Sequence, residues 1–258
     1  MFCFILGKSF FDCNKLKSIN LPKNLKKIQV VNPVSDDQLA IVFSGCSSLG
    51  RINVDSENSV FKSVDGVLYN YSKNMLIKCP EAKNGKVIIP DWCESVYRVT
   101  DFESPFSNCY YVTSISFPQK FKLGKIQDIL SDTNLKSVVI DENHNKFKSV
   151  DGVCYTKNMK TIKFFPKMFK NNFIMPDTVV ELDCKFEGEN IVLGANYGIN
   201  EKYDKDIDLD EQSAYFSIFD CIEAKNVQIS PKNPKYSIKN NKVYLKGNNH
   251  LIYDFNKQ

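Results

Sequence analysis

The sequence predicts a repeat solenoid that consists mainly of β-strands. Three observations predict it: an apolar pattern that recurs along the chain, short apolar segments closed by a proline, and a nine-residue stretch, FKSVDGV(L/C)Y, found at residues 61–69 and again at 147–155. Self-similarity of this kind is typical of repeat architectures, in which each unit packs mainly against its neighbours.

The recurring apolar pattern is centred on a cysteine. Cys13 is preceded three positions earlier by Phe10 and followed at three, six and eight positions by Leu16, Ile19 and Leu21. The F-x-x-C part predicts one turn of α- or 3₁₀-helix, because apolar residues three apart share a helical face. The alternation that follows predicts a short strand with one buried face. Further copies are centred on Cys46, Cys109 and Cys221, and a fifth has Asp132 in place of the cysteine.

Short apolar segments closed by a proline lie between these copies: INLPKNLKKI at 19–28, VIIPDWCESV at 87–96 and FIMPDTVVEL at 173–182. Proline removes a ladder donor and ends strand pairing, so these segments predict further short strands of the same repeat. A unit of one strand, one loop and one turn cannot bury its apolar side alone, and neighbouring units must therefore stack.

A longer repeat predicts inserted β-hairpins. Residues 61–80 and 147–166 are nearly the same, and 236–255 are a third, more divergent copy. The dipeptides Asp65-Gly66 and Asp151-Gly152, and less strictly Asn240-Asn241, tolerate the positive φ of a two-residue hairpin turn. We therefore expect a single domain over 1–258 with super-repeats at roughly 1–60 (incomplete), 61–146, 147–235 and 236–258 (incomplete).

Together the F-x-x-C-x-x-L-x-x-I-x-(L/I/V) units, the I-P segments and the F-x-S-x-DGVLY hairpin resemble the BspA-like leucine-rich-repeat family of bacterial and protist surface proteins. The resemblance covers the chain except about residues 185–215. It implies a right-handed leucine-rich-repeat coil with short helical or 3₁₀ turns and inserted β-hairpins. It also implies a role in adhesion or protein recognition, with no catalytic residues.

Composition and charge narrow the class of partner. With 43% hydrophobic and 12% aromatic residues the chain can bury a core. The net charge of +4, from 34 basic and 30 acidic residues, is small and spread out, which argues against nucleic acid as a partner. The opening MFCFILG makes a poor signal peptide, and no apolar run reaches the roughly 20 residues that span a bilayer. We therefore expect no direct membrane insertion.

The sequence leaves the cellular compartment of the protein undecided. The resemblance favours the cell surface, whereas the missing signal peptide and the unpaired cysteines favour the cytoplasm. Nine cysteines, an odd number without a C-x-x-C pair, do not form a disulfide framework or zinc motif. Their recurrence in register predicts buried structural thiols instead.

No motif for catalysis or for a cofactor emerges, so we expect no enzyme, no cofactor and no metal. His144 and His250 lie in the polar stretches DENHN and GNNHL and are interpreted as surface turn residues. Residues 196–216 form an acidic insertion whose alternating aspartates resemble a calcium loop, but the glycine and glutamate that an EF-hand requires are missing. A solvated insertion is the interpretation, with an opportunistic calcium contact as the alternative.

The outward positions of the predicted strands are the candidate binding face, because a solenoid presents them as one extended surface. They could equally form a plain solvated sheet face. Hairpin aromatics are a second candidate surface, although the equivalent register of three tyrosines favours packing. The face residues are Ser18, Asn20, Arg51, Asn53, Ser114, Ser116, Ser137, Val139, Asn226 and Gln228, and the hairpin aromatics are Tyr69, Tyr71, Tyr155 and Tyr244.

Two functions are consistent with the sequence. The first is a recognition module that binds a protein partner or a cell-surface ligand. The alternative is an intracellular structural component that packs into a larger assembly. Because no polar capping repeat is evident at either end of the sequence, end-to-end self-association is also expected.

Overall fold

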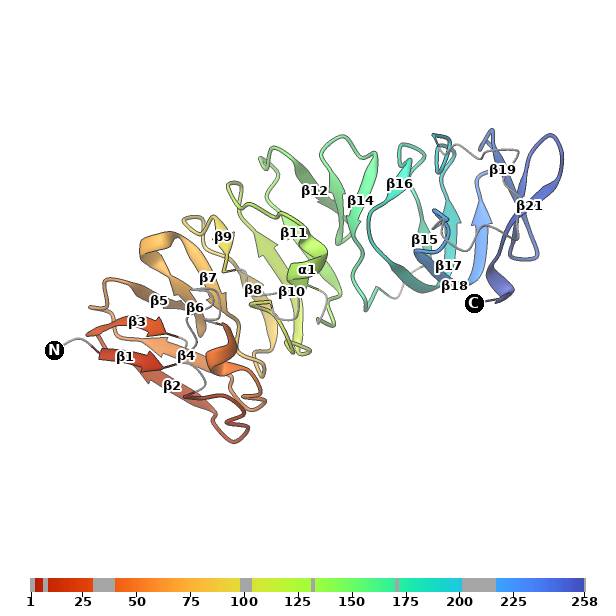
Figure 1. The fold of residues 1–258 in the computed structure, drawn as a ribbon. Helices are drawn as coiled ribbons and strands as arrows, with labels where there is room; N and C mark the ends of the chain where they lie inside the picture. Colours follow the sequence, from red (N-terminus) through yellow and green to blue (C-terminus); the bar gives the residue numbers. More distant parts are fainter. Residues whose placement is uncertain are drawn as a thin grey trace. The chain divides into compact units, whose positions relative to one another are not determined.

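The computed structural model describes residues 3–6, 9–29, 40–97, 104–130, 133–169, 172–200 and 217–257. The chain divides into two compact units, Met1–Asn145 and Lys146–Gln258, and each is described by itself. The described residues are mainly β, with one α-helix of five residues, α1 (Ile126–Leu130) (Figure 1). Whether 1–258 forms a single domain stays a prediction.

Three sheets of the first unit consist of parallel strands. β10 lies between its two neighbours with Ile115 opposite Val87 and Val138, and Ile52 of β4 lies opposite Ile19 of β2. The strands that the apolar pattern and the proline-closed segments predict in this unit are confirmed, and β1 is an additional strand that neither predicts. Their bounds are β1 (Cys3–Leu6), β2 (Ser18–Leu21), β3 (Leu25–Gln29), β4 (Arg51–Val54), β8 (Gly85–Ile88), β10 (Val112–Phe117) and β11 (Ser137–Ile140), in the sheets β1-β3, β2-β4 and β8-β10-β11.

The second unit contains the parallel sheet β15-β17-β18. The apolar pattern predicts only the second half of β18 (Ile222–Ile229). Its neighbour β17 (Phe186–Leu193) pairs with it along the whole strand, although residues 185–215 lie outside the repeat pattern. β15 (Phe173–Ile174) is the segment closed by Pro176.

The predicted hairpins are present, and each has three antiparallel strands. Both central residues of every first turn have positive φ: 49° and 81° at Asp65 and Gly66, 50° and 84° at Asp151 and Gly152, and 53° and 57° at Asn240 and Asn241. Two-residue hairpin turns of type I′ need this pair of conformations. The strands are β5 (Phe61–Val64), β6 (Val67–Asn70) and β7 (Met75–Lys78); β12 (Phe147–Val150), β13 (Val153–Thr156) and β14 (Thr161–Phe164); β19 (Tyr236–Lys239), β20 (Lys242–Leu245) and β21 (His250–Asp254).

The F-x-x-C segments form tight turns of the predicted 3₁₀ kind. In three copies the amide of the cysteine donates to the carbonyl three residues earlier, as in Cys109 N to Phe106 O at 3.0 Å. In three copies the residue before the cysteine has positive φ, which explains why it is Asp12, Gly45 or Asn108. The second copy also contains the 3₁₀-helix η1 (Ala40–Phe43). Asp132, the centre of the fifth copy, lies outside the described residues.

A buried asparagine follows the last strand before two of the hairpins. Asn58 donates its Nδ2 to the carbonyls of Pro22 and Leu25 at 2.9 and 3.0 Å, and its Oδ1 accepts from the amides of Val60 and Phe61 at 2.9 and 2.8 Å. Asn233 makes the equivalent four bonds in the second unit. Each asparagine thus joins the hairpin entry to the preceding repeat.

His144 occupies the equivalent position, and the expectation of a surface turn histidine is wrong there. The residue is only 3% exposed, and its Nε2 lies 3.0 Å from the carbonyl of Phe121, which corresponds to Leu25. The stretch DENHN is polar, so the sequence alone predicts a solvent-exposed turn. It does not show that the preceding repeat covers this turn. His250 is exposed and begins β21.

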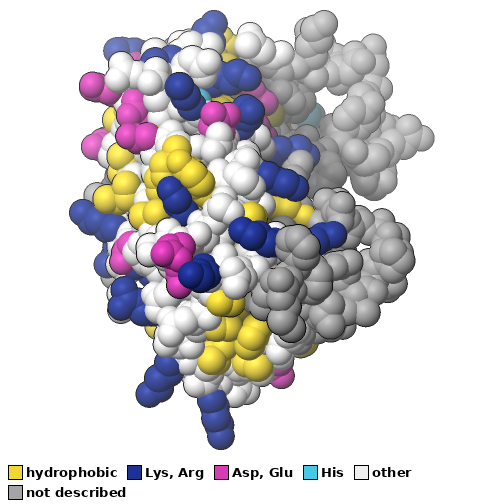
Figure 2. All heavy atoms as spheres, turned by 90° about the vertical axis from the view of Figure 1, so that its left-hand side faces the viewer, with side chains coloured by type: hydrophobic (Ala, Val, Ile, Leu, Met, Phe, Trp, Pro, Cys, Tyr) yellow, Lys and Arg dark blue, Asp and Glu magenta, His cyan; other side chains and the backbone are white. Residues whose placement is uncertain are grey.

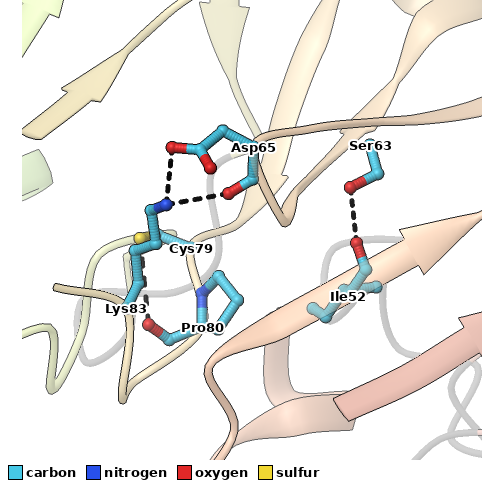
Figure 3. A network of polar contacts seen from close by, with 6 residues as sticks. All are labelled: Ile52, Ser63, Asp65, Cys79, Pro80 and Lys83. Carbon is cyan, nitrogen blue, oxygen red and sulfur yellow. Dashed lines mark hydrogen bonds and ion pairs between the residues drawn. The ribbon is translucent and has the colours of Figure 1, made fainter.

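The hairpin turn covers the free edge of the preceding strand. In the first unit Gly66 O accepts from Ile52 N at 2.9 Å, and Ser63 Oγ donates to Ile52 O at 2.5 Å; Lys83 Nζ holds the turn from the other side through Asp65 (Figure 3). In the second unit Asn241 bonds the edge of β18 through its side chain. The repeated nine-residue stretch therefore satisfies backbone groups that an open edge would expose.

Candidate functional site

The outward side chains of the parallel strands form two rows in each sheet. The first row contains Ser18 and Arg51 in the sheet β2-β4, Lys86, Ser114 and Ser137 in the sheet β8-β10-β11, and Asn172, Asn190 and Asn226 in the sheet β15-β17-β18. The second row, two residues later in each strand, contains Asn20 and Asn53, then Ile88, Ser116 and Val139, then Ile174, Val192 and Gln228. Within each group the residues are register partners on adjacent strands, except that Asn172 immediately precedes β15.

Hydrogen bonds join neighbouring side chains of the first row. In the second unit Asn190 Nδ2 donates to Asn172 Oδ1 at 2.7 Å, and Asn226 Nδ2 donates to Asn190 Oδ1 at 2.8 Å. In the first unit Ser137 Oγ donates to Ser114 Oγ at 2.9 Å. These bonds fix the side chains in place, so a partner would meet a preordered polar strip.

Not every predicted face residue is accessible. Ser114 is only 7% exposed, because it lies on the central strand β10 between Lys86 and Ser137. Asn53, Ser116 and Ser137 are half-buried. The other predicted face residues, which are Ser18, Asn20, Arg51, Val139, Asn226 and Gln228, are exposed.

The second row contains exposed aliphatic side chains that sequence reasoning missed. Ile88 is 70% exposed and Ile174 72%, and Val139 on the same row is 46% exposed. Both isoleucines lie in the I-P segments, which were interpreted only as further short strands. The signal was available: Ile88 and Ile174 stand two residues before a proline, as Asn20 and Ser116 do.

Charged side chains around the rows of the second unit pair across the strands. Lys185 Nζ lies 2.6 Å from Glu223 and 3.4 Å from Glu187, and Lys225 Nζ lies 2.8 Å from Glu189. Figure 2 shows basic and acidic side chains interspersed over one face of the molecule. Such a distribution differs from the concentrated basic face that binds nucleic acid.

The hairpin tyrosines divide into packing and exposed residues. Tyr69 and Tyr155 are buried and Tyr244 is half-buried, in equivalent register opposite Leu76, Ile162 and Leu251. Burial raises the pKa of Tyr69 and of Tyr155 well above the usual value for tyrosine. This supports the packing role that their register favours.

Tyr71 is the exposed hairpin aromatic of the first unit. Its ring packs edge-on against Trp92 with centroids 4.9 Å apart, and the ammonium of Lys62 lies 3.4 Å from its centroid. A cation over one ring face and a second ring at the edge hold Tyr71 in position.

The cysteines are free thiols that pack against backbone carbonyls. Eight cysteines in the described part of the chain are free, and six of these are buried, with Cys13 and Cys221 half-buried. Cys46 Sγ donates to Phe10 O at 2.9 Å and Cys109 Sγ to Cys79 O at 3.4 Å. Thiols of the recurring pattern thus link neighbouring repeats.

Burial of these thiols predicts a loss of stability at high pH. Desolvation raises the pKa of Cys154 to about 12 and that of Cys93 to about 11. An unfolded thiol ionises near pH 8.5, at about its usual pKa. Above that pH the unfolded state therefore binds fewer protons than the folded state, and the free energy of unfolding should fall as the pH rises through the folded values.

Denaturation of wild type and Cys154→Ala between pH 7 and 12 checks this linkage. The variant should lose stability less steeply with pH, because one titrating thiol is gone. Val153→Ala, a neighbouring buried substitution, should lower stability by the same amount at every pH. Parallel curves for wild type and Cys154→Ala would contradict the assignment.

Two buried charged residues lie under the turns of the first unit. Glu81 Oε1 accepts from Gly45 N at 2.9 Å and from Asn108 Nδ2 at 3.3 Å, so it joins the turns of two repeats. Lys78 Nζ donates to Ser107 O at 3.4 Å. Through these hydrogen bonds both side chains connect neighbouring turns.

The described residues contain neither a cluster of metal ligands nor a membrane-spanning helix. Among them, no three His, Cys, Asp or Glu side chains lie close enough together to hold a metal ion. The acids of the insertion, Asp204, Asp206, Asp208, Asp210 and Glu211, lie outside the described residues. No helix in the described ranges is both long enough and apolar enough to cross a membrane.

Comparison with known proteins gives matches among solved structures. No protein-family model matches the sequence, and no curated protein matches it. A solved leucine-rich-repeat protein from Eubacterium ventriosum is 13% identical, with a TM-score of 0.41 over 71% of this chain and 49% of that one. A leucine-rich cell surface protein from Faecalibacterium prausnitzii is 14% identical, with a TM-score of 0.37 over 88% and 63%.

The pneumococcal vaccine antigen PcpA is 20% identical, with a TM-score of 0.35 over 72% of this chain and 54% of that chain. This chain therefore matches 49% to 63% of the length of the three solved structures.

Proposed function

We propose that this chain, which is similar to leucine-rich-repeat proteins of known structure, is a non-enzymatic recognition module built as a right-handed solenoid. Its partner is a protein or a cell-surface ligand that binds the outward rows of the parallel strands. The observation that carries the proposal is made in each unit by itself. The first unit has the hydrogen-bonded Ser114 and Ser137 beside exposed Ile88 and Val139, and the second has the hydrogen-bonded Asn172, Asn190 and Asn226 beside exposed Ile174.

This combination fits protein recognition for a physical reason. Exposed β-branched side chains on a sheet lose little rotamer freedom when they are buried, so their apolar surface contributes to affinity at low entropic cost. The ordered amides and hydroxyls beside them supply hydrogen bonds that select a partner. A plain solvated sheet face has no need for isoleucines that are 70% and 72% exposed.

Site-specific photocrosslinking in the native cells tests the proposal. A photoreactive phenylalanine at position 88, 139 or 174 should yield one discrete adduct, which an excess of unlabelled wild-type chain suppresses. Controls carry the same group at exposed Gln119 and Asn248, which lie in turns outside both rows. Equal adducts at the controls, or none at the three row positions, would contradict the proposed surface.

The second candidate function is a structural component of a larger intracellular assembly. One observation favours it: eight described cysteines are free thiols, which persist most readily in a reducing compartment. Protease treatment of intact cells separates the two candidates. Loss of the chain from intact cells favours adhesion, whereas protection until the cells are opened favours the assembly component.

A further inference from the structure

Lys78 is a buried lysine at a position where the other two hairpins have an aromatic residue. It pairs with the central hairpin strand in the register that Phe164 has in the second hairpin and Tyr253 in the third. Lys78 is only 1% exposed, and its Nζ makes one long hydrogen bond, to Ser107 O at 3.4 Å, and no ion pair with a described residue. Burying an ammonium group with so little compensation is costly. The hairpin itself therefore does not explain a lysine at this position.

The segment around Lys78 lies against the turn of the following repeat. The amide of Cys79 donates to Pro105 O at 2.9 Å. Ser107, which accepts the hydrogen bond from Lys78, immediately precedes Asn108 in the same turn. The amine of the lysine is thus held beside the residue that carries a side-chain amide.

The side-chain amide of Asn108 is hydrogen-bonded at both ends. Its Nδ2 donates to Glu81 Oε1 at 3.3 Å, and its Oδ1 accepts from the hydroxyl of Tyr110 at 3.1 Å. Glu81 is itself only 5% exposed. A donor at the carbonyl oxygen polarises an amide towards nucleophilic attack, and a carboxyl group at the nitrogen can protonate that nitrogen as it leaves. A buried amine, a buried carboxyl group and a polarised amide therefore lie together between the first hairpin and the following repeat.

We propose that Lys78 and Asn108 form a modification site, at which an intramolecular isopeptide bond joins Lys78 Nζ to Asn108 Cγ with Glu81 as the proton carrier. Before the reaction Nζ contacts the carbonyl of the preceding residue, so a rotation within the flexible lysine side chain brings it to Cγ.

The reaction balances without any further reactant. Glu81 takes a proton from the ammonium group, the neutral Nζ attacks Cγ of Asn108, and the hydroxyl of Tyr110 stabilises the negative charge on Oδ1. Glu81 then gives its proton to Nδ2, and the bond between Cγ and Nδ2 breaks. In total the lysine ammonium group and the asparagine amide become a secondary amide and one ammonium ion, and the Glu81 carboxylate is regenerated.

The bond explains why a lysine occupies an apolar position. It converts the buried ammonium group into a neutral amide, which removes the cost of burying a charge. It also cross-links the first hairpin to the following repeat, and a cross-link stabilises a fold because it restricts the unfolded chain. The second hairpin has Phe164 in place of the lysine and an exposed Lys167 in place of the glutamate, so it contains no such site. The inference does not depend on the recognition of a partner.

Mass spectrometry of the purified full chain tests the proposal. The intact mass should be lower than the mass of the sequence by one ammonia molecule, and a proteolytic digest should contain a branched peptide that joins positions 78 and 108. Glu81→Gln keeps a hydrogen-bond acceptor but cannot carry the proton, so this variant should show no loss of mass. Lys78→Met should show none either, and it should fold because aromatic residues occupy the equivalent position in the other hairpins.

The dipeptide Asn84-Gly85 is a second possible source of the same loss, because an asparagine before a glycine can cyclise onto the following amide with release of ammonia. In that case the loss persists in Lys78→Met and the digest contains no branched peptide, which would overturn the proposal. A folded wild-type chain with the full mass of the sequence would overturn it as well. A branched peptide from Glu81→Gln would refute the role of Glu81 as the proton carrier.

Discussion

Replacing Asn58 by alanine should lower the free energy of unfolding of the first unit by about 3 to 5 kcal/mol. The side chain is buried and makes four bonds to backbone groups, two to carbonyls of the preceding repeat and two to amides of the hairpin entry. Alanine leaves these backbone groups without hydrogen-bond partners in a place that solvent does not reach. The free energy of unfolding therefore falls by the desolvation cost of several of these groups.

Chemical denaturation followed by tryptophan fluorescence measures this effect, because the single tryptophan, Trp92, lies in the same unit with its ring 5.3 Å from that of Tyr69. Asn143→Ala is the matched control, since Asn143 is an exposed asparagine in the turn before the second hairpin. It should change the free energy of unfolding by less than about 0.5 kcal/mol. Similar effects of both substitutions would show that Asn58 does not join the repeats.

Gly66→Ala should destabilise the first unit by about 2 to 4 kcal/mol, more than Gly85→Ala, which should cost about 1 kcal/mol. Both glycines have positive φ, 81° and 76°, so both substitutions carry the same backbone strain. A Cβ at Gly66 would also lie 2.7 Å from Arg51 Cβ and 3.1 Å from its Cα, whereas a Cβ at Gly85 meets nothing within 4 Å.

The difference in destabilisation between the two glycine variants measures the effect of the close approach of the hairpin turn to β4. To admit the methyl group the turn must move away, which lengthens the bond from Ile52 N to Gly66 O. The same fluorescence-detected denaturation compares the variants, and hydrogen exchange of the Ile52 amide should accelerate only in Gly66→Ala. Equal destabilisation by both variants would mean that the turn does not protect this edge.

These two sites also explain the role of the nine-residue stretch in its first copy. The amide of Phe61, the first residue of the stretch, donates to buried Asn58, and the Asp-Gly turn covers the edge of the preceding strand. The third copy uses the Asn241 side chain where the first uses the Gly66 carbonyl, so two chemistries satisfy the equivalent strand amide, Val227 N in the third copy and Ile52 N in the first. The stretch is therefore explained by edge protection and does not require a binding or catalytic role.

The sequence by itself determined the hairpins, the short parallel strands and the tight turns before the cysteines. Turn residues act locally: Asp65-Gly66 and Asn240-Asn241 tolerate the positive φ that the hairpin turn needs, and period-two alternation defines the buried face of a strand without knowledge of its neighbours. β17 was missed because its sequence has no counterpart among the other repeats.

Only the tertiary structure decided which polar side chains are shielded and which apolar ones are exposed. His144 is buried against Phe121 of the preceding repeat, and Ser114 is shielded by strands on both sides. In each case the exposure of a residue depends on chain segments far from it in sequence. The local sequence pattern specifies the direction of a side chain, but its burial depends on which chain segments pack over it.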